Sequence, residues 1–180
     1  MSELSPITPQ NTNLLHANKF LLAFSRLPNV QYFCQSLPLP GLSMGEGLQA
    51  TPFVDLYVPG DKLLYDMLAI TFLVDEDLKS WMEIHDWMRA MTYPTEFAEY
   101  ARLNRLNPPH TSKVKPQYSD AALVILDSSQ NSNYRVTFKN CYPTSLSAIQ
   151  FSTTGQGPLE TMTADATFRY DYYNIESTHN

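Results

Sequence analysis

The chain has 180 residues, 43% hydrophobic and 17% charged, so it has the apolar material for one folded domain and is not intrinsically disordered. Its formal net charge of −6 argues against a nucleic-acid binder held by phosphate contacts. No secretory signal and no apolar run of membrane-spanning length is visible, so we expect a soluble protein made in a cytoplasm. Cys34 and Cys141 lack CxxC spacing, and we expect two buried thiols rather than a disulfide.

The first part of the chain predicts an arm followed by two strands. Residues 1–17 are polar, contain two prolines and predict an N-terminal arm outside the core. Residues 19–27 alternate in hydrophobicity, which is typical of a strand buried on one face. After a turn at 27–29, residues 30–36 predict its neighbour.

A hairpin is predicted for residues 53–74. Pro59 and Gly60 fit the central positions of a tight turn, and residues 67–74 form a strongly apolar second strand. Residues 37–47 carry two prolines and three glycines, so they are too broken for a central strand. We expect these glycines to permit bends or bulges in an edge segment.

Residues 74–91 predict an amphipathic helix. Its apolar stripe consists of Leu78, Trp81, Met82, Ile84, Trp87, Met88 and Met91. The opposite side carries Lys79, Glu83, Asp86 and Ala90. Asp75, Glu76 and Asp77 stand where carboxylates cap free helical N–H groups. The same acidic groups could form a metal or acid/base site, but His85 is the one histidine and a helical zinc site takes two ligands from one face. The pattern favours a packing helix.

Residues 92–118 predict a long irregular loop with four prolines, and loops of that length are usually functional or mobile. Its basic residues are Arg102, Arg105, Lys113 and Lys115. Stacking aromatics flank this run without interleaving with it, and the whole chain is acidic. We therefore favour docking on an acidic surface of another copy or partner over nucleic-acid binding.

The last third of the chain predicts further strands. They cover residues 121–127, 134–140, 145–151 and 159–175. In the closing strand, Met162, Ala164, Ala166, Phe168, Tyr170 and Tyr172 face one way, and Thr161, Thr163, Asp165, Thr167, Arg169 and Asp171 face the other. A strand this long and regular is expected at the centre of its sheet. The fold class is thus mainly β with one helix.

Two short motifs resemble catalytic or phosphate-binding loops. Residues 41–45 match G-x-S-x-G, but no strand precedes Ser43 and no helix follows it, so a serine hydrolase is disfavoured. Residues 153–158 are glycine-containing but lack the strand-to-helix context and the lysine of a phosphate loop. We expect a turn there.

Three segments together resemble the tail-tube proteins of contractile-tailed bacteriophages, including the baseplate proteins that initiate the tube. Residues 58–88 resemble that family's hairpin arm, apolar strand and tryptophan-bearing helix. Residues 134–152 resemble its strand, Pro-containing corner and further strand, and residues 161–176 its closing strand with a Tyr-Asp-aromatic ending. The resemblance covers a single domain over residues 18–176 and leaves 177–180 as a tail, whereas the loop at 92–118 departs from it.

The resemblance implies a small two-sheet β-sandwich or barrel with one flanking amphipathic helix and a projecting hairpin, assembled into hexameric rings. It implies a structural virion protein of the tail tube or of its baseplate-proximal start, with no enzymatic activity, cofactor or metal. Its partners would be other copies of itself, sheath and baseplate proteins, and genomic DNA passing through the lumen without specific binding, but no membrane. The alternatives are a tail terminator or completion ring protein and a non-viral ligand-binding β-sandwich.

Residues for these contacts follow from the same resemblance. Candidates for contacts between subunits or rings are Pro59, Gly60, Asp61, Arg102, Arg105, Lys113 and Lys115. Candidates for the lumen are Thr163, Asp165 and Thr167 on the polar face of the closing strand.

Overall fold

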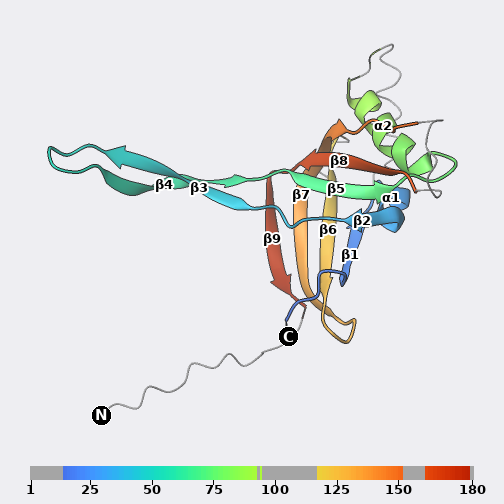
Figure 1. The fold of residues 1–180 in the computed structure, drawn as a ribbon, viewed down its shortest axis with the longest axis horizontal. Helices are drawn as coiled ribbons and strands as arrows, with labels where there is room; N and C mark the ends of the chain where they lie inside the picture. Colours follow the sequence, from blue (N-terminus) through green and yellow to red (C-terminus); the bar gives the residue numbers. More distant parts are fainter. Residues whose placement is uncertain (1–13, 93, 95–116, 152–160, 179–180) are drawn as a thin grey trace.

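The computed structural model describes residues 14–92, 94, 117–151 and 161–178. One antiparallel sheet is formed by β1 (Phe20–Phe24), β6 (Ser119–Leu126), the first part of β7 (Ser132–Leu146) and β9 (Tyr172–Ser177). A second sheet contains the end of β7, β8 (Thr163–Arg169), β5 (Leu68–Leu73) and β2 (Cys34–Ser36). In Figure 1 the strands of the first sheet run vertically, and those of the second cross above them. The mainly β prediction is confirmed.

The two sheets are joined through β7, which turns a corner near Asn140. Up to Cys141 this strand pairs with β6 and β9, and from Tyr142 onward it pairs with β8. Asn140 has a positive φ of 57°, which asparagine tolerates better than most residues, and its N–H donates to Asp120 Oδ1 at 3.1 Å. The result is a strand order of β1-β6-β7-β8-β5-β2, a nearly closed barrel with β9 added beside β7.

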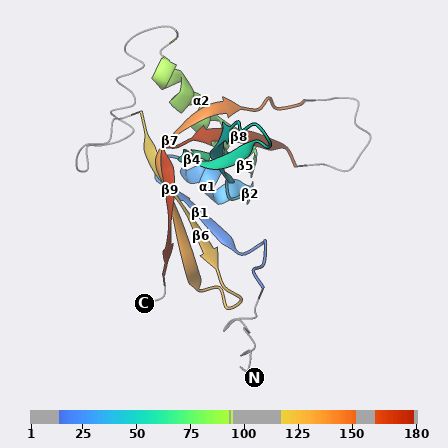
Figure 2. The same cartoon turned by 90° about the vertical axis from the view of Figure 1, so that its left-hand side faces the viewer.

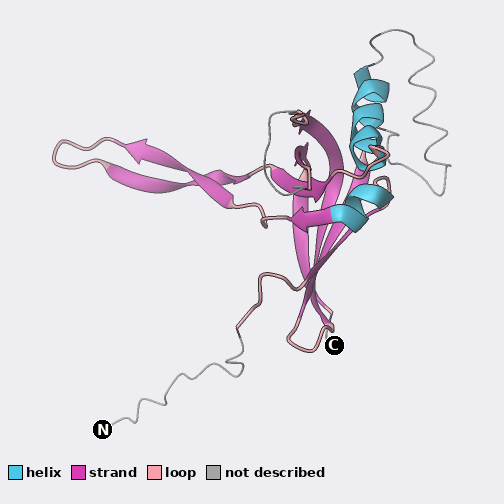
Figure 3. Cartoon of the chain, turned by 45° about the vertical axis from the view of Figure 1, so that its right-hand side comes forward, coloured by secondary structure: helices cyan, strands magenta, loops and turns pink. Residues whose placement is uncertain are grey.

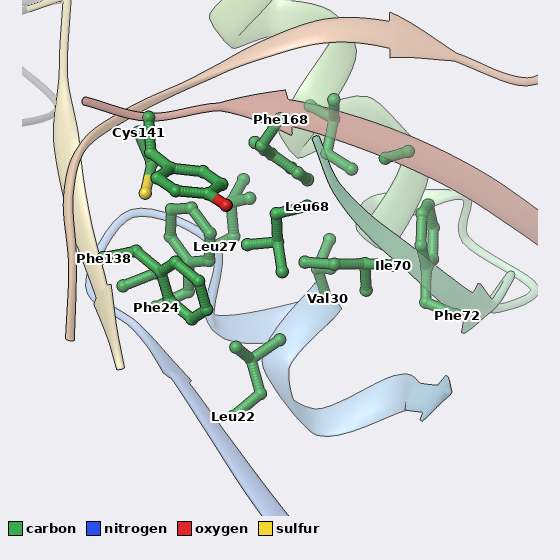
Figure 4. Close-up of a cluster of buried hydrophobic side chains, with 14 of the residues drawn as sticks. Leu22, Phe24, Leu27, Val30, Leu68, Ile70, Phe72, Phe138, Cys141 and Phe168 are labelled. Carbon is green, nitrogen blue, oxygen red and sulfur yellow. The ribbon is translucent and has the colours of Figure 1, made fainter. Parts of the chain in front are cut away.

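The core lies between the two sheets and is built by alternate residues of each strand. Along β5, Leu68, Ile70 and Phe72 are completely buried while the residues between them are half-buried. On β8, Phe168 points into the same core (Figure 4). This alternation confirms the predicted strand at 67–74 and the central position of the closing strand, because β8 lies between β7 and β5.

Two helices cover one side of the barrel. α1 (Pro28–Phe33) follows β1, and α2 (Lys79–Thr92) follows β5 (Figure 3). Trp87 of α2 is 1% exposed and lies against Phe24 and Phe168, with ring centroids 6.0 and 6.2 Å away. The amphipathic helix predicted at 74–91 is confirmed and begins later, at Lys79. Neither helix of the described residues is long and apolar enough to cross a membrane.

Three predictions about element boundaries are wrong. Residues 30–33, predicted as the start of a strand, belong instead to α1, because Pro28 suits the first turn of a helix. The segment 145–151 is not a separate strand, since β7 runs on to Leu146 and no strand follows it before 151. The closing segment 159–175 is broken at Tyr170 and Asp171 into β8 and β9, which pair with different parts of β7. The break sets Tyr172 apart from the buried face of β8.

Candidate assembly surfaces

The most distinctive feature of the molecule is a two-stranded arm, β3 (Leu42–Gln49) and β4 (Leu56–Tyr65). Among the described residues these strands pair only with each other, from Leu42 opposite Tyr65 to Gln49 opposite Leu56. Figures 1 and 3 show this arm projecting far from the barrel, on the side away from the helices. An isolated two-stranded hairpin is at best marginally stable in water, so the arm needs further contacts to be rigid.

The arm exposes an unusual amount of apolar surface. Phe53, in the connection between its strands, is 98% exposed, and Tyr57 is 71% exposed. Eight more large hydrophobic residues of the arm are at least 43% exposed: Leu42, Met44, Leu48, Val54, Leu56, Val58, Leu63 and Leu64. Burying one such side chain completely is worth about 1.5–3 kcal/mol. So many exposed apolar side chains on one element mark a protein–protein contact.

The prediction that Pro59 and Gly60 form the turn of the hairpin is wrong. Both lie inside β4, where Pro59 is opposite Glu46, and the connection between the strands covers residues 50–55. Pro59 is tolerated because β4 is an edge strand that needs no ladder hydrogen bond from this residue. The register shifts between Met44 and Glu46, but the extra residues are on β4 and not in the 37–47 segment, because one residue separates Met44 from Glu46 and three separate Pro59 from Leu63.

Gly60 is nevertheless a position that needs glycine, for a different reason. No glycine of the described residues has a positive φ, so turn geometry is not the cause. A Cβ at Gly60 would come within 2.3 Å of the Gly45 carbonyl oxygen across the bulge. A Cβ at Gly45 would meet nothing within 4 Å. At this close approach the requirement for glycine therefore lies at Gly60 on β4 and not at Gly45 on β3. Asp61 follows as an exposed residue of the same strand.

The outer face of β8 is polar and connected by hydrogen bonds. Thr163, Asp165 and Thr167 alternate with the buried residues of β8 and point away from the core, as predicted. The Thr71 hydroxyl on β5 donates to Asp165 Oδ1 at 2.6 Å, and the Thr144 and Thr167 hydroxyls are 3.1 Å apart. These contacts fix short polar side chains in place on this face.

Asp75 caps the start of α2, whereas Asp77 pairs with the Lys79 ammonium group. Both carboxylate oxygens of Asp75 accept backbone N–H bonds from the start of the helix, from Lys79 at 3.1 Å and from Ser80 at 2.8 Å. His85 stacks on Trp81 with ring centroids 5.2 Å apart and contacts Asp86. No group of three or more His, Cys, Asp or Glu side chains in the described part of the chain could hold a metal ion.

Glu83 has a structural role that the helical pattern did not indicate. It was expected on a solvated face, yet its carboxylate reaches α1 and accepts bonds from Asn29 N at 3.1 Å, Asn29 Nδ2 at 2.7 Å and Val30 N at 3.4 Å. Burial raises its pKa above the ordinary value, and the hydrogen bonds from Asn29 and Val30 oppose that effect. Ala90, expected on the same face, is 4% exposed. α1 thus contacts this side of α2 at Glu83, whereas Lys79 and Asp86 on the same side remain exposed.

The remaining candidates divide into placed and unplaced residues. Ser43 lies within β3 opposite Leu64, away from any strand-to-helix turn, so it has no catalytic setting. Both cysteines are free; Cys141 is buried, as predicted, whereas Cys34 is half-buried. Burial raises the pKa of Cys141 to about 12 and that of Cys34 to about 11. The four basic residues at 102–115 and the 153–158 segment lie outside the described residues.

Comparison with known proteins identifies the family. The model of a family described as phage tail tube protein matches residues 8–176. The tail tube terminator protein of Enterobacteria phage T4 is 30% identical over 147 residues, which cover 79% of this chain and 76% of that protein.

Solved structures show the same fold at low sequence identity. The tube-terminating cap of the anti-feeding prophage superposes with a TM-score of 0.58 and 13% identity, covering 98% of this chain and 100% of that one. A chain of the anti-feeding prophage baseplate gives 0.53 and 10% identity, covering 94% and 100%. A chain of the PVC sheath–tube complex, from an extracellular contractile injection system, gives 0.52 and 12% identity, covering 93% and 94%. With the family match, these likenesses confirm the predicted fold and resemblance: the chain belongs to the phage tail tube protein family, as a structural component of the virion tail and not an enzyme.

Proposed function

We propose that this protein forms the ring that ends the tail tube, as a tube terminator. This changes the sequence-based expectation, in which a tube or baseplate-proximal protein came first and a terminator was the alternative. Support comes from the relative in phage T4, which is called a tail tube terminator, and from the likeness to the anti-feeding prophage cap. A terminator ring would contact the last ring of tube protein on one face, and sheath components around it.

The exposed β3–β4 arm is the observation that supports assembly. Ten large hydrophobic side chains of the arm are at least 43% exposed, and their exposure to water is unfavourable in a monomer. Homo-oligomeric rings use heterologous contacts, in which an element of one copy binds a different surface of the next. The arm, including the predicted contact residues Pro59, Gly60 and Asp61 in β4, supplies such an element, and a hexamer is the ring that the family resemblance implies.

The polar outer face of β8 is the proposed lining of the channel. Thr163, Asp165 and Thr167 present hydroxyls and a carboxylate, and Arg169 at the end of the same face adds one cation. Six copies, each at a formal charge of −6, give about −36 per ring. A lining with a single arginine per copy beside Asp165 and the threonine hydroxyls would repel phosphate weakly and let DNA pass through water without specific binding.

The position in the tail is tested by labelling and counting. An epitope placed after residue 178 should appear at one site per virion by electron microscopy, at the end of the tube opposite the baseplate. Quantitative mass spectrometry should give one ring of copies per tail, against many for the tube protein. Label along the tube would identify a tube protein, and label at the baseplate a tube initiator; either result contradicts the proposal.

Assembly is tested with the purified protein. Negative-stain images should show separate rings that do not elongate into tubes at high concentration, because a terminator must end a stack rather than extend it. Long tubes formed by this protein alone would contradict the terminator role while leaving membership of the family intact. A density map of the ring in which Asp165 lies on the outer wall would contradict the proposed lining of the channel.

A further inference from the structure

β1 is an open edge of the barrel. The strand order runs from β1 to β2 without pairing them, so each has one strand neighbour in the described residues. The backbone carbonyl of Lys19 accepts from Leu126 N on β6, so Lys19 and the alternate residues after it face β6. The backbone groups of Phe20, Leu22 and Phe24 therefore point toward the open side.

Among the described residues, the backbone of the open edge is hydrogen-bonded at one end of β1 and not at the other. The Phe24 N–H donates to the side chain of Gln31, on α1, at 2.9 Å, which ends any ladder there. No such bond is present for Phe20 or Leu22 among the described residues. Backbone N–H and C=O groups of this kind are a ready template for pairing with another strand.

A groove of about 500 Å³ lies along this edge. It is lined by residues of β1, α1 and β2 and of the segment before β1: Phe20, Leu22, Gln31, Tyr32, Cys34, Gln35, Ala17 and Asn18. The groove thus occupies the place where one more strand would close the barrel. Its lining carries no charged residue, so an uncharged extended segment fits it.

The arm and this groove lie on opposite sides of the molecule. In Figures 1 and 3 the arm projects to one side, while β1, β2 and α1 are on the other. Figure 2 shows β1 and β6 extending below the second sheet. A donor on one side and an acceptor on the other is the arrangement that a head-to-tail ring contact needs, whereas a two-fold dimer uses the same patch twice.

We propose that the groove between β1 and β2 accepts the β3–β4 arm of a second copy, which adds a strand beside β1. Backbone hydrogen bonds to Phe20 and Leu22 give the contact its direction, and the exposed apolar side chains of the arm fill the groove. The contact rests on the proposed ring and specifies which surface of the neighbour the arm occupies. It also accounts for a barrel that stops one strand short of closure.

Disulfide trapping tests the contact with a thiol that the groove already contains. The thiol in the groove is Cys34, and neighbouring strands are about 5 Å apart, within reach of a disulfide. Cys141 is completely buried, so it does not cross-link. A cysteine on the arm, Tyr57→Cys or, on its other face, Leu56→Cys, should give a ladder of cross-linked oligomers on oxidation of assembled rings. The ladder should disappear when Cys34→Ser is added. The matched control, Glu176→Cys on β9, should give none.

The outcomes separate this contact from the ring itself. Rings that form normally but give no ladder with either arm cysteine overturn the contact and leave the terminator ring intact, as does an equal ladder from Glu176→Cys. Absence of rings under all conditions overturns both. Hydrogen exchange of the unmodified protein provides a second measurement, with amides of Phe20 and Leu22 exchanging at least about tenfold more slowly in rings than in dissociated subunits. Equal exchange in both states contradicts the contact.

Discussion

The two tryptophans of α2 should contribute very differently to stability. The sequence places both on one apolar stripe and predicts similar losses on truncation, but the structure separates them. Trp87 is 1% exposed, packs against Phe24 and Phe168, and donates Nε1–H to the Gln117 carbonyl at 3.1 Å. Trp81 is half-buried at the surface and donates to the Ser147 carbonyl at 3.2 Å.

Trp87→Ala should lower the free energy of unfolding by about 3–5 kcal/mol, because it removes a large buried ring and leaves a cavity. That is a large fraction of the roughly 5–15 kcal/mol that stabilises a typical domain. Trp81→Ala should cost about 1–2 kcal/mol, since only part of its ring leaves water on folding. Trp87→Phe keeps an apolar ring but leaves the Gln117 carbonyl without its donor, for an intermediate loss of about 1–3 kcal/mol.

Urea unfolding followed by far-UV circular dichroism measures these differences, at protein concentrations below ring assembly. The slope with denaturant should stay constant, so that midpoints report stability. Equal losses for the two alanine variants, or a larger loss for Trp81→Ala, would refute the assignment of Trp87 to the centre of the core.

Three further predictions concern single residues. Glu83→Ala should lower the free energy of unfolding by about 1–2 kcal/mol, because α1 loses its cap. The pKa of Glu83 is raised in the folded state, which therefore binds the proton more tightly, so wild type should gain stability relative to Glu83→Gln as pH falls from neutral toward the carboxyl's ordinary pKa of 4.5. A stability difference that widens in favour of wild type as pH rises would contradict this. Gly60→Ala should impair ring formation, measured by analytical ultracentrifugation, with little change in the unfolding midpoint of the barrel. The control variant Gly45→Ala should assemble normally. Equal behaviour of the two variants would mean that the close approach at the bulge does not matter. Asn140→Ala should be less stable than Asn140→Gly by about 1–2 kcal/mol in thermal or urea unfolding, because both lose the side-chain amide and only alanine is strained at a positive φ; equal stability would count against the left-handed corner of β7.

Local burial patterns were readable from the sequence wherever one face of an element meets the core of the same chain. The period-two alternation of β5 and β8 and the stripe containing Ile84 and Trp87 follow from that condition. The polar outward direction of Thr163 and Asp165 followed as well, since successive side chains of a strand point to opposite faces. These features depend on neighbours within a few residues, so they need no knowledge of the fold.

Tertiary structure decided the features that depend on distant or external partners. Glu83 resembles any solvated helical carboxylate until α1, more than fifty residues earlier in the chain, places two backbone N–H groups beside it. Trp81 and Trp87 have the same chemistry and lie on the same stripe, and only the position of β1 and β8 makes one of them central. The sequence pattern did not identify β3 and β4 as a strand pair. Both faces of the arm are exposed in the single chain, so neither face shows the alternation that burial imposes. Its Pro59-Gly60 therefore looked like a turn, when the glycine is required by a backbone across the bulge that local sequence cannot show.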